Sequence, residues 1–582
     1  MRAPVATLAP PYLPRRPTET VLYGLVRANL ATFLAHAREH YEGGLPKYVE
    51  AELRAYLKCG LFSEGFSRAR CEACGHDLLV AFSCKSRTAC PSCAGRRMAN
   101  TASAIVDRVL PDDVPVRQYV LTLPYELRKL AAFKADVLTA IGRIAVEAIF
   151  ASYRARAKRH GVADAQCGAI NFVQRCGSSV NLNVHFHIAL LDGVFTRDAD
   201  VGVLFHPASA PTRSELDAII ERVEKRAMAW LRRHGYLDER PIDERSNEPL
   251  AQTALDACAA IAMGRGEVAT LPNGEAPEAE ADHEAAPDKP AVAVDRAGFN
   301  LHAGTRIEAG DDMGRERLAR YGARPPLSLE RLRRLPGGRF AYRLKYVSRG
   351  RGKFRVMTGL EFMARLASIL APPRYPLVRY AGVLGPRSAW RKDIVPKPRE
   401  RRPACEGAVV DPPGDDTSGP RAKPKKDDSS KREGFAPRPD RPNETAGPAQ
   451  QTGSGAAMIA LAPDVVVRPG DDVRPGDVIA LAPNILSVRH WDRLLGGALY
   501  AATPRVDWAS LLRRSFDVDV MACAKCGGRL RVLAVITERE PVRRILAHLD
   551  LPTEAAPLAH ARDPTDDLDD VEQRGQLEFG LA

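Results

Sequence analysis

Several common features are missing from this sequence, and each missing feature excludes a class of protein. The 582-residue chain has no run of 18 apolar residues, which excludes an ordinary membrane-spanning helix. It has no GxxxxGK[ST] segment, so a P-loop nucleotide motor is not expected. Its first 16 residues are rich in proline and lack the apolar core of a secretory signal. We therefore expect a cytoplasmic protein without a membrane partner, whose 12 cysteines are thiols or metal ligands rather than disulfides.

The charge balance is positive. Lys and Arg number 85 against 72 Asp and Glu, which gives a formal net charge of +13. A basic excess favours a polyanionic partner such as nucleic acid, or an acidic membrane surface. The length exceeds what one hydrophobic core supports, so three or four structural units are expected.

Composition and periodicity divide the chain into four parts. Residues 1–105 predict a helical and zinc-binding module, and residues 106–395 predict an α+β unit of alternating helices and strands. Within that unit, residues 236–293 turn polar and acidic, which predicts a partly disordered insertion. Residues 396–456 are typical of a disordered linker. Residues 457–582 predict a small C-terminal module.

The most distinctive pattern lies in residues 178–193, which are apolar and β-branched enough to form a buried strand. Because side chains alternate along a strand, His185 and His187 share one face and Phe186 takes the other. Two imidazoles on a rigid strand supply two ligands of a metal site; the alternative is a pair of buried, hydrogen-bonded histidines. Residues 169–175 predict a preceding strand, and the short turn between the strands predicts a hairpin that brings Gln174 beside the histidines.

The strongest signal from spacing alone comes from two CxxC pairs separated by fifteen residues. This spacing matches a structural zinc site, because four thiolates leave no open position on the ion. The predicted ligands of this Zn²⁺ are Cys71, Cys74, Cys90 and Cys93. Three neighbours either replace a ligand or simply pack: Cys59, Cys84 and His76. Basic residues around the cysteines suit phosphate contact, although a solvated face is the alternative; they include Lys85, Arg96 and Arg97.

A third CxxC pair, Cys523 and Cys526, stands alone in the C-terminal part. It is either half of a zinc ribbon completed by a distant Cys or His, or a tight thiol turn without metal. The sequence leaves both interpretations open.

Taken in order, these blocks resemble the transposases of the insertion sequence 91 family, which belong to the HUH class and move DNA by a rolling-circle route. The resemblance rests on residues 82–85, 90–93, 96–98, 172–175, 181–187, 301–304, 318–321, 324–326, 379–384 and 526–528. The linker and residues 236–293 lie outside it. Several ordered blocks are far more specific than any one of them.

The resemblance implies a central HUH-endonuclease-like antiparallel sheet with helices, and a particular reaction. A tyrosine hydroxyl attacks a DNA phosphodiester and leaves a 5′-phosphotyrosine and a free 3′-OH. A phenol is a poor nucleophile at neutral pH, so Mg²⁺ or Mn²⁺ on the histidine pair would polarise the phosphate. The covalent bond stores the phosphodiester energy, consistent with the missing P-loop. The implied partner is single-stranded or locally melted DNA at element ends and target, in the bacterial cytoplasm at the nucleoid.

By position in the family pattern, Tyr321 is the expected nucleophile, with an aromatic side chain packed on the core as the alternative. His185 and His187 are the expected metal ligands, and Gln174 is the candidate third ligand, with His302 as another. The DNA-contacting residues expected from these blocks are Lys85, Arg96, Arg97, Arg320 and Arg324.

The sequence departs from the two-tyrosine members, which carry a second tyrosine four residues from the first. Those positions hold Arg317 and Pro325 here, so a one-tyrosine variant is predicted. A second cleavage would then use Tyr321 again, a water or another tyrosine; the candidates are Tyr342, Tyr346 and Tyr380. Competing hypotheses are a replication initiator or relaxase with the same chemistry, and a catalytically inactive zinc-dependent DNA-binding protein.

Overall fold

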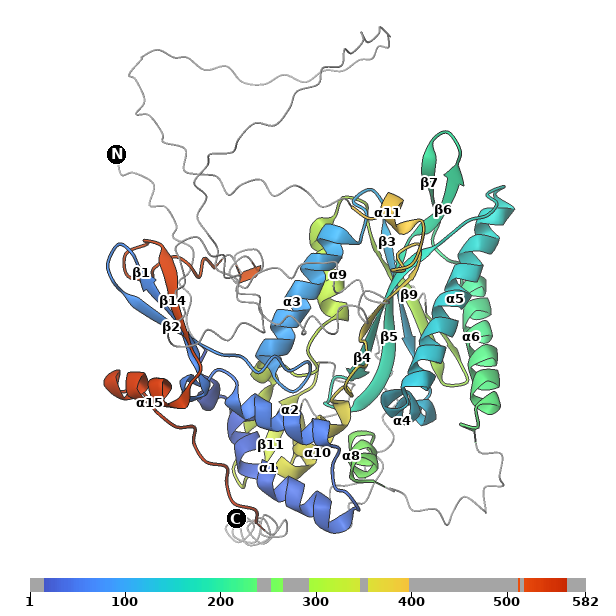
Figure 1. The fold of residues 1–582 in the computed structure, drawn as a ribbon. Helices are drawn as coiled ribbons and strands as arrows, with labels where there is room; N and C mark the ends of the chain where they lie inside the picture. Colours follow the sequence, from blue (N-terminus) through green and yellow to red (C-terminus); the bar gives the residue numbers. More distant parts are fainter. Residues whose placement is uncertain are drawn as a thin grey trace, which may run out of the picture. The chain divides into compact units, whose positions relative to one another are not determined.

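The computed structural model describes residues 15–237, 253–264, 293–345, 354–396, 511–512 and 518–562, whose helices and strands are shown in Figure 1. The N-terminal helices are α1 (Val21–His40), α2 (Lys47–Lys58) and α3 (Pro91–Arg108). Further along the chain follow α4 (Tyr125–Phe133), α5 (Ala135–Arg159), α6 (Arg213–Arg233), α8 (Ala254–Ala262), α9 (Asp312–Gly322), α10 (Gly359–Ile369), α11 (Arg391–Ile394) and α15 (Arg539–His548). Short 3-10 turns cover Pro17–Glu19, Phe62–Glu64 and Leu329–Arg331.

A six-stranded antiparallel sheet forms the centre of the α+β unit. Its spatial order is β13 (Val378–Gly382), β4 (Gly168–Cys176), β5 (Leu182–Leu191), β3 (Val116–Thr122), β9 (Phe299–Ile307) and β8 (Ala293–Arg296). Every side chain of β4 and β5 is buried, as expected for central strands covered on both faces. The predicted antiparallel sheet with helices is therefore confirmed.

The predicted hairpin is formed by β4 and β5, joined by a short turn. Their register places Gln174 opposite His185, and Phe172 opposite His187. A one-residue slip would have moved both histidines to the other face. The hairpin prediction is therefore confirmed, and so is the predicted position of Gln174 beside His185.

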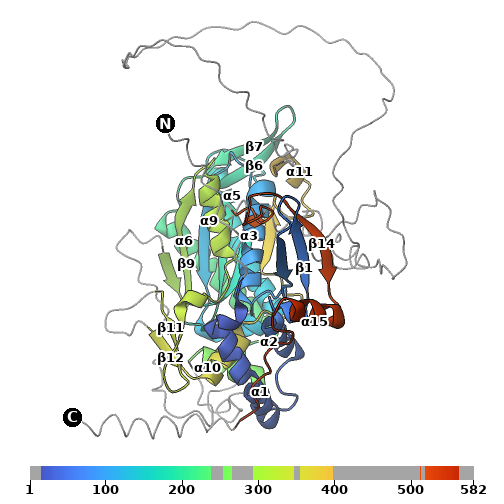
Figure 2. The same cartoon turned by 90° about the vertical axis from the view of Figure 1, so that its left-hand side faces the viewer.

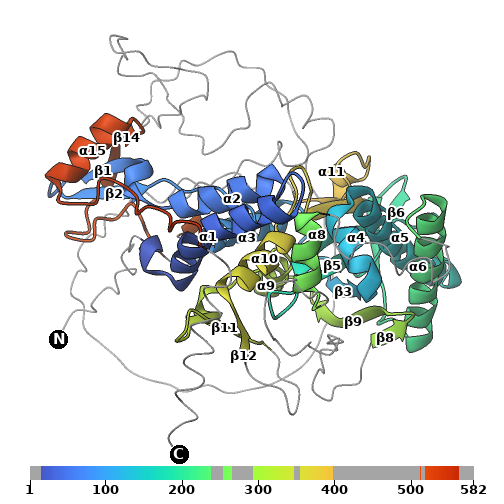
Figure 3. The same cartoon turned by 90° about the horizontal axis from the view of Figure 1, so that it is seen from below.

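Helices cover both faces of this sheet. Phe186 points toward α5, where a Cβ added to Gly142 would lie 3.0 Å from its ring. α5 packs in turn against α6, and Figure 3 shows the two helices side by side. The opposite face, which carries His185 and His187, is covered by α9, where a Cβ added to Gly322 would lie 2.7 Å from the ring of Phe172. α3 packs against α9. The histidines are thus enclosed between the sheet and a helical layer.

The buried carboxylate of Asp192, just after β5, connects the sheet to α5. Asp192 has no exposed surface and accepts two hydrogen bonds of 2.9 Å from the guanidinium of Arg117. Arg306 donates to the same carboxylate at 2.8 Å and the Tyr153 hydroxyl at 2.6 Å. Because these partners come from β3, β9 and α5, the carboxylate ties three elements to the end of the histidine strand.

Three smaller sheets are also present in the described residues. One pairs β10 (Leu332–Arg334), β11 (Phe340–Arg343) and β12 (Phe354–Met357), and another pairs β6 (Gly193–Asp198) with β7 (Gly202–Pro207). The third has the order β14 (Leu530–Ile536), β1 (Phe66–Cys71) and β2 (Asp77–Ala81). Figure 2 shows β14 beside β1, with α15 at its end.

The third sheet corrects the predicted domain division. β14 pairs along the whole of β1, from Phe66 opposite Ile536 to Cys71 opposite Leu530. The C-terminal segment therefore completes a sheet of the N-terminal module instead of forming a module of its own. Sequence periodicity could not reveal this, because pairing between distant strands leaves no local pattern.

The described residues of the predicted insertion include the helix α8. Within residues 236–293, α8 buries Cys258, Ala259 and Ala262 and packs against α10. Its alanine-rich sequence favours a helix even though the flanking parts of the sequence are polar. Residues 238–252 and 265–292, and residues 397–456 of the predicted linker, lie outside the described part of the chain. Among the described helices, none combines the length and apolar character needed to cross a bilayer.

Candidate active site

The histidine pair lies on β5, on the face covered by α9. The rings of His185 and His187 are 5.0 Å apart between centroids, at 66° to each other. Nδ1 of His185 lies 2.9 Å from the Asn183 carbonyl oxygen, to which it donates. This bond leaves the Nε2 lone pair of His185 for another partner, since a neutral imidazole has one donor and one acceptor nitrogen.

Burial keeps both imidazoles neutral. Loss of solvent lowers the pKa of His185 from 6.5 to about 4, and it also lowers the pKa of His187 well below its usual value. The neighbouring cations Arg324 and Lys345 act in the same direction on His187. Nε2 of His187 is buried and has no hydrogen-bond partner among the described residues. Neutral imidazoles with available nitrogen lone pairs fit a divalent cation.

Gln118, on β3, was missed by the sequence analysis. Its side-chain amide lies 2.6 Å from Nδ1 of His187. The atom at this distance is the amide nitrogen of Gln118. An amide turned by 180° would place the oxygen there, accept the Nδ1 proton and leave Nε2 of His187 for a cation, the arrangement found around many metal-binding histidines. Only the pairing of β3 with β5 brings Gln118 there, so no local motif could have found it.

Gln174 lies where the sequence predicted, opposite His185, but its amide already has partners. Its Nε2 donates to the carbonyl oxygens of Tyr321 and Gly322 at 2.7 and 3.1 Å. Its Oε1 accepts from Nε of Arg324 at 3.0 Å. Gln174 thus links β4, the strand beside the histidine strand, to the last turn of α9, and its role as third ligand stays a prediction. The other candidate, His302, lies on β9, beyond β3.

Tyr321 projects from the last turn of α9 toward the histidines. Its ring meets that of His187 edge-on, with centroids 5.2 Å apart and planes at 88°. The guanidinium of Arg324 lies 4.4 Å from the centroid of the Tyr321 ring, and the ammonium of Lys345 lies 5.2 Å from it. Tyr321, the histidine pair and two cations therefore meet at one place, although they come from three separate parts of the sequence.

The position of α9 is fixed at both ends. At its start, the Asp311 side chain accepts from the Gly314 N–H at 2.7 Å, an N-cap. The fully buried Arg315 donates to the carbonyl oxygens of Asp112 and Val114 at 2.6 and 2.9 Å. At its end, Gln174 binds the final carbonyls. These anchors hold the helix against the sheet and so set the direction of the Tyr321 side chain.

Four thiols beside α2 and α3 lie within 4.8 Å of one another: Cys59, Cys84, Cys90 and Cys93. The sulfurs of Cys59 and Cys93, of Cys84 and Cys93, and of Cys59 and Cys90 are each 3.6 Å apart. A tetrahedral ion with Zn–S bonds of about 2.3 Å separates its sulfurs by about 3.8 Å. The cluster therefore has the dimensions of a structural zinc site.

Two transposase family models match parts of this chain. Residues 168–391 match the family model described as "Putative transposase", and residues 28–123 match the "Transposase zinc-binding domain" model of insertion sequence 91. The transposase for insertion sequence element IS801 of Pseudomonas savastanoi pv. phaseolicola is 29% identical over 188 residues, which are 32% of this chain and 41% of that protein. The chain belongs to the insertion sequence 91 family of transposases. The match spans less than half of that relative's length, and no solved structure matches.

In this insertion sequence 91 family member, the structure corrects the predicted grouping of zinc ligands. Only two of the four predicted thiols, Cys90 and Cys93, belong to the cluster beside α2 and α3. The other two join the C-terminal pair in a second cluster of four: Cys71, Cys74, Cys523 and Cys526. The physical reason is that the chain between the first two CxxC pairs runs through the strand β2, which separates the pairs. Cys59 and Cys84, named as substitutes, complete the first cluster instead.

The residues expected to contact DNA have different surroundings. Lys85 and Arg97 are exposed on the loop and helix beside the first cluster, and Arg96 is half-buried on α3. Arg320 donates to the Glu316 carboxylate one turn earlier at 2.6 and 3.0 Å. Arg324 lies over the Tyr321 ring. Arg324 is thus the expected DNA contact that lies nearest the histidine pair.

The alternative tyrosines differ in accessibility. Arg317, at the position of a second family tyrosine, is exposed on α9. Tyr342 is fully buried, and its hydroxyl accepts from the Ser328 N–H. Tyr380 lies half-buried on the edge strand β13, and Tyr346 lies outside the described residues. Burial makes Tyr342 unsuitable as a second nucleophile.

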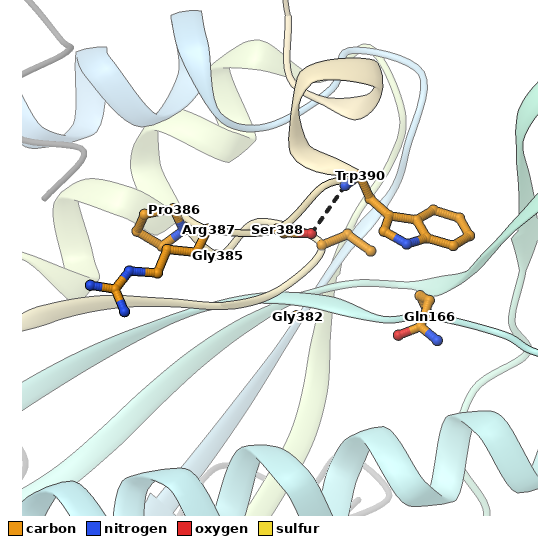
Figure 4. Close-up of a pocket in the computed structure, with 8 residues that line it drawn as sticks. Gln166, Gly382, Gly385, Pro386, Arg387, Ser388 and Trp390 are labelled. Atoms are coloured by element: carbon orange, nitrogen blue, oxygen red, sulfur yellow. Dashed lines mark hydrogen bonds between the residues drawn. The ribbon is translucent and has the colours of Figure 1, made fainter. Parts of the chain in front are cut away.

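A pocket of about 520 Å³ lies elsewhere on the sheet (Figure 4). It is lined by Gln166, Trp390 and the loop around Ser388, whose hydroxyl oxygen accepts from the Trp390 N–H at 3.3 Å. Gln166 precedes β4, whereas Gln174 stands near its other end, about 26 Å away at the rise of an extended strand. The pocket is therefore separate from the candidate active site.

Proposed function

We propose that this chain is a transposase that nicks and rejoins single-stranded DNA through a tyrosine-linked intermediate, in a rolling-circle route. The observation that supports the proposal best is the edge-on contact of Tyr321 with His187, at 5.2 Å between ring centroids. The hydroxyl oxygen of Tyr321 attacks the phosphorus, and the bond from phosphorus to the 3′ oxygen breaks. The phenol loses a proton as the departing 3′ oxygen gains one. The 5′ phosphate stays on the tyrosine until a 3′-OH displaces it.

The histidine pair would hold the cation that such a reaction requires. His185 and His187 fit Mg²⁺ or Mn²⁺ through Nε2, and Gln174 is the proposed third ligand. A bound divalent cation supplies charge neutralisation at the scissile phosphate. With its amide oxygen turned toward Nδ1, Gln118 would keep His187 in the required tautomer. Arg324 and Lys345 face the Tyr321 ring, where they would contact phosphate oxygens.

The proposed substrate is an unpaired strand at an element end or target. The attacked phosphorus has to reach a tyrosine that is half-buried between a helix and a sheet, which a flexible single strand achieves more readily than a duplex. Because α3 packs against α9, Arg96 and Arg97 lie on the helix next to the one that carries Tyr321. Basic residues there would contact phosphates along the single-stranded DNA.

The test is a suicide oligonucleotide that carries candidate element ends, incubated with the full-length protein and Mn²⁺ or Mg²⁺. We expect a covalent protein–DNA adduct that disappears in Tyr321→Phe and persists in the matched control Tyr380→Phe. His187→Ala should reduce the adduct while single-strand binding remains. An adduct that survives Tyr321→Phe would overturn the nucleophile assignment.

Two other outcomes would redirect the functional assignment. If folded wild-type protein binds the strand but never forms an adduct with any of the candidate ends, the chain is a DNA-binding protein without catalysis. If the adduct forms, a plasmid assay with a marked element separates the remaining hypotheses. A transposase moves the marker to a new site, whereas a replication initiator only copies its own plasmid.

A further inference from the structure

The second group of thiols joins the two ends of the described chain. We call this group the clasp, and it consists of Cys71, Cys74, Cys523 and Cys526. Within it, the sulfurs of Cys71 and Cys526 are 3.5 Å apart, and those of Cys74 and Cys523 are 3.7 Å apart. These separations are close to the roughly 3.8 Å expected around a tetrahedral zinc ion. They far exceed a disulfide bond of about 2.05 Å.

Both halves of the clasp have the same backbone geometry. In the first half, the Gly75 N–H donates to the Cys71 carbonyl at 3.0 Å, and Gly75 has φ of 71°. In the second half, the Gly527 N–H donates to the Cys523 carbonyl at 2.8 Å, and Gly527 has φ of 74°. The left-handed conformation suits glycine in each case. Two matching CxxCG turns facing each other present four sulfurs to one point.

Hydrogen bonds and strand pairing hold the two halves in place. The Gly528 N–H donates to the Cys526 sulfur at 3.4 Å, a contact that stabilises a thiolate. The strands that lead into and out of the turns, β1 and β14, are paired, so that Cys71 lies opposite Leu530. Behind them, Val542 and Leu546 of α15 pack against Phe66.

We propose that the clasp binds a second structural Zn²⁺, which fastens the C-terminal segment to the N-terminal module. The ion would be shared between ligands about 450 positions apart in sequence. It is distinct from the ion at the cluster beside α2 and α3, because the two clusters share no cysteine. The ion would thus link β1 and β2 to the described C-terminal residues 518–562. Zinc binding at the clasp would not depend on the DNA chemistry.

The first test is the zinc content of the full-length protein, purified with reductant so that no disulfide forms. We expect about two zinc ions per chain in wild type and about one in the double variant Cys523→Ser/Cys526→Ser. The same loss is expected for Cys71→Ser/Cys74→Ser, because either half alone cannot hold the ion. Cys258→Ala, outside both clusters, should keep two. A wild-type content of one, or a double variant that still holds two, would overturn the proposal.

The second test measures whether the clasp holds the C-terminal segment on the N-terminal module. A specific protease site is inserted between residues 410 and 430, and the folded full-length protein is cleaved there. We expect the C-terminal fragment to stay bound to the remainder during size-exclusion chromatography, and a chelator or Cys523→Ser/Cys526→Ser to release it. Retention that neither treatment alters would mean that strand pairing alone joins the ends, and that the zinc does not fasten them.

Cobalt substitution guards against misfolded variants. Co²⁺ reports thiolate ligation through its charge-transfer absorption, so wild type titrated with Co²⁺ should show two four-thiolate sites. The double variant should keep the absorption of one site, which would show that the cluster beside α2 and α3 is intact. Loss of both signals would identify a global folding defect, and the Cys71→Ser/Cys74→Ser variant and the cleavage assay would then decide. A protein that does not cleave DNA should still show the same zinc content, fragment retention and cobalt absorption.

Discussion

Acid should weaken the fold through the buried histidines. Burial lowers the pKa of His185 from 6.5 to about 4, so below pH 6.5 the unfolded chain binds a proton that the folded chain excludes. The free energy of unfolding therefore falls as the pH drops from about 6.5 to about 4, and above pH 6.5 the group contributes nothing. One pKa unit is worth about 1.4 kcal/mol, so His185 accounts for about 3 kcal/mol of acid destabilisation. The pKa of His187 is lowered in the same direction.

The assay compares urea unfolding of the full-length protein with that of His185→Gln at pH 7, 5.5 and 4.5. Glutamine is polar and does not titrate, so the variant should lose less stability in acid than the wild type. Carboxylates that titrate in the same range contribute equally to both proteins and cancel in the difference. Mn²⁺ should oppose the acid effect in wild type only, because a metal that binds the neutral imidazoles favours the folded state. Parallel pH curves for the two proteins would refute the assignment of His185 as a buried neutral base.

The remaining predictions concern the supports of the site. Asp192→Ala leaves the buried Arg117 without its carboxylate and should cost about 3–5 kcal/mol in urea unfolding, since an uncompensated charge stays buried; a loss under 1 kcal/mol would contradict this. Gly322→Ala places a Cβ 2.7 Å from the Phe172 ring at the end of α9 and should slow adduct formation by about 100-fold with single-strand binding unchanged. Cys90→Ser should remove the zinc of its own cluster and leave the clasp loaded, measured by zinc content; loss of both ions would mean that the clusters are not independent.

Much of the fold was predictable because its signals are local. Alternation identified the β5 strand, and the short turn before it identified its partner β4, so the neighbourhood of Gln174 and His185 followed from adjacent segments. Helix α1 starts just after Thr20, whose side chain accepts from the Tyr23 N–H, a local N-cap. In each case, residues within about twenty positions determine the structure.

The cysteine pairing was not predictable in the same way. The fifteen-residue spacing between the first two CxxC pairs satisfies the ordinary zinc pattern, so spacing alone joined Cys74 to Cys90. The structure instead pairs β1 with a strand more than 450 residues later. Any two CxxC pairs could supply the four ligands of a zinc site. Which two pairs come together is decided by the order of strands in the sheet.

The candidate active site also combines local signals with contacts between distant segments. The histidine pair is visible in the sequence because both residues lie on one strand, whereas the surrounding groups arrive from elements that the sequence does not connect. Gln118 reaches His187 through the pairing of β3 with β5, and Tyr321 reaches it because buried Arg315 anchors α9. Gln174, predicted as a ligand from its position alone, holds the end of that helix. A residue next to the histidine pair can therefore be needed for orienting Tyr321. Gln174→Leu would release the end of α9, whereas Gln118→Leu would disturb only His187.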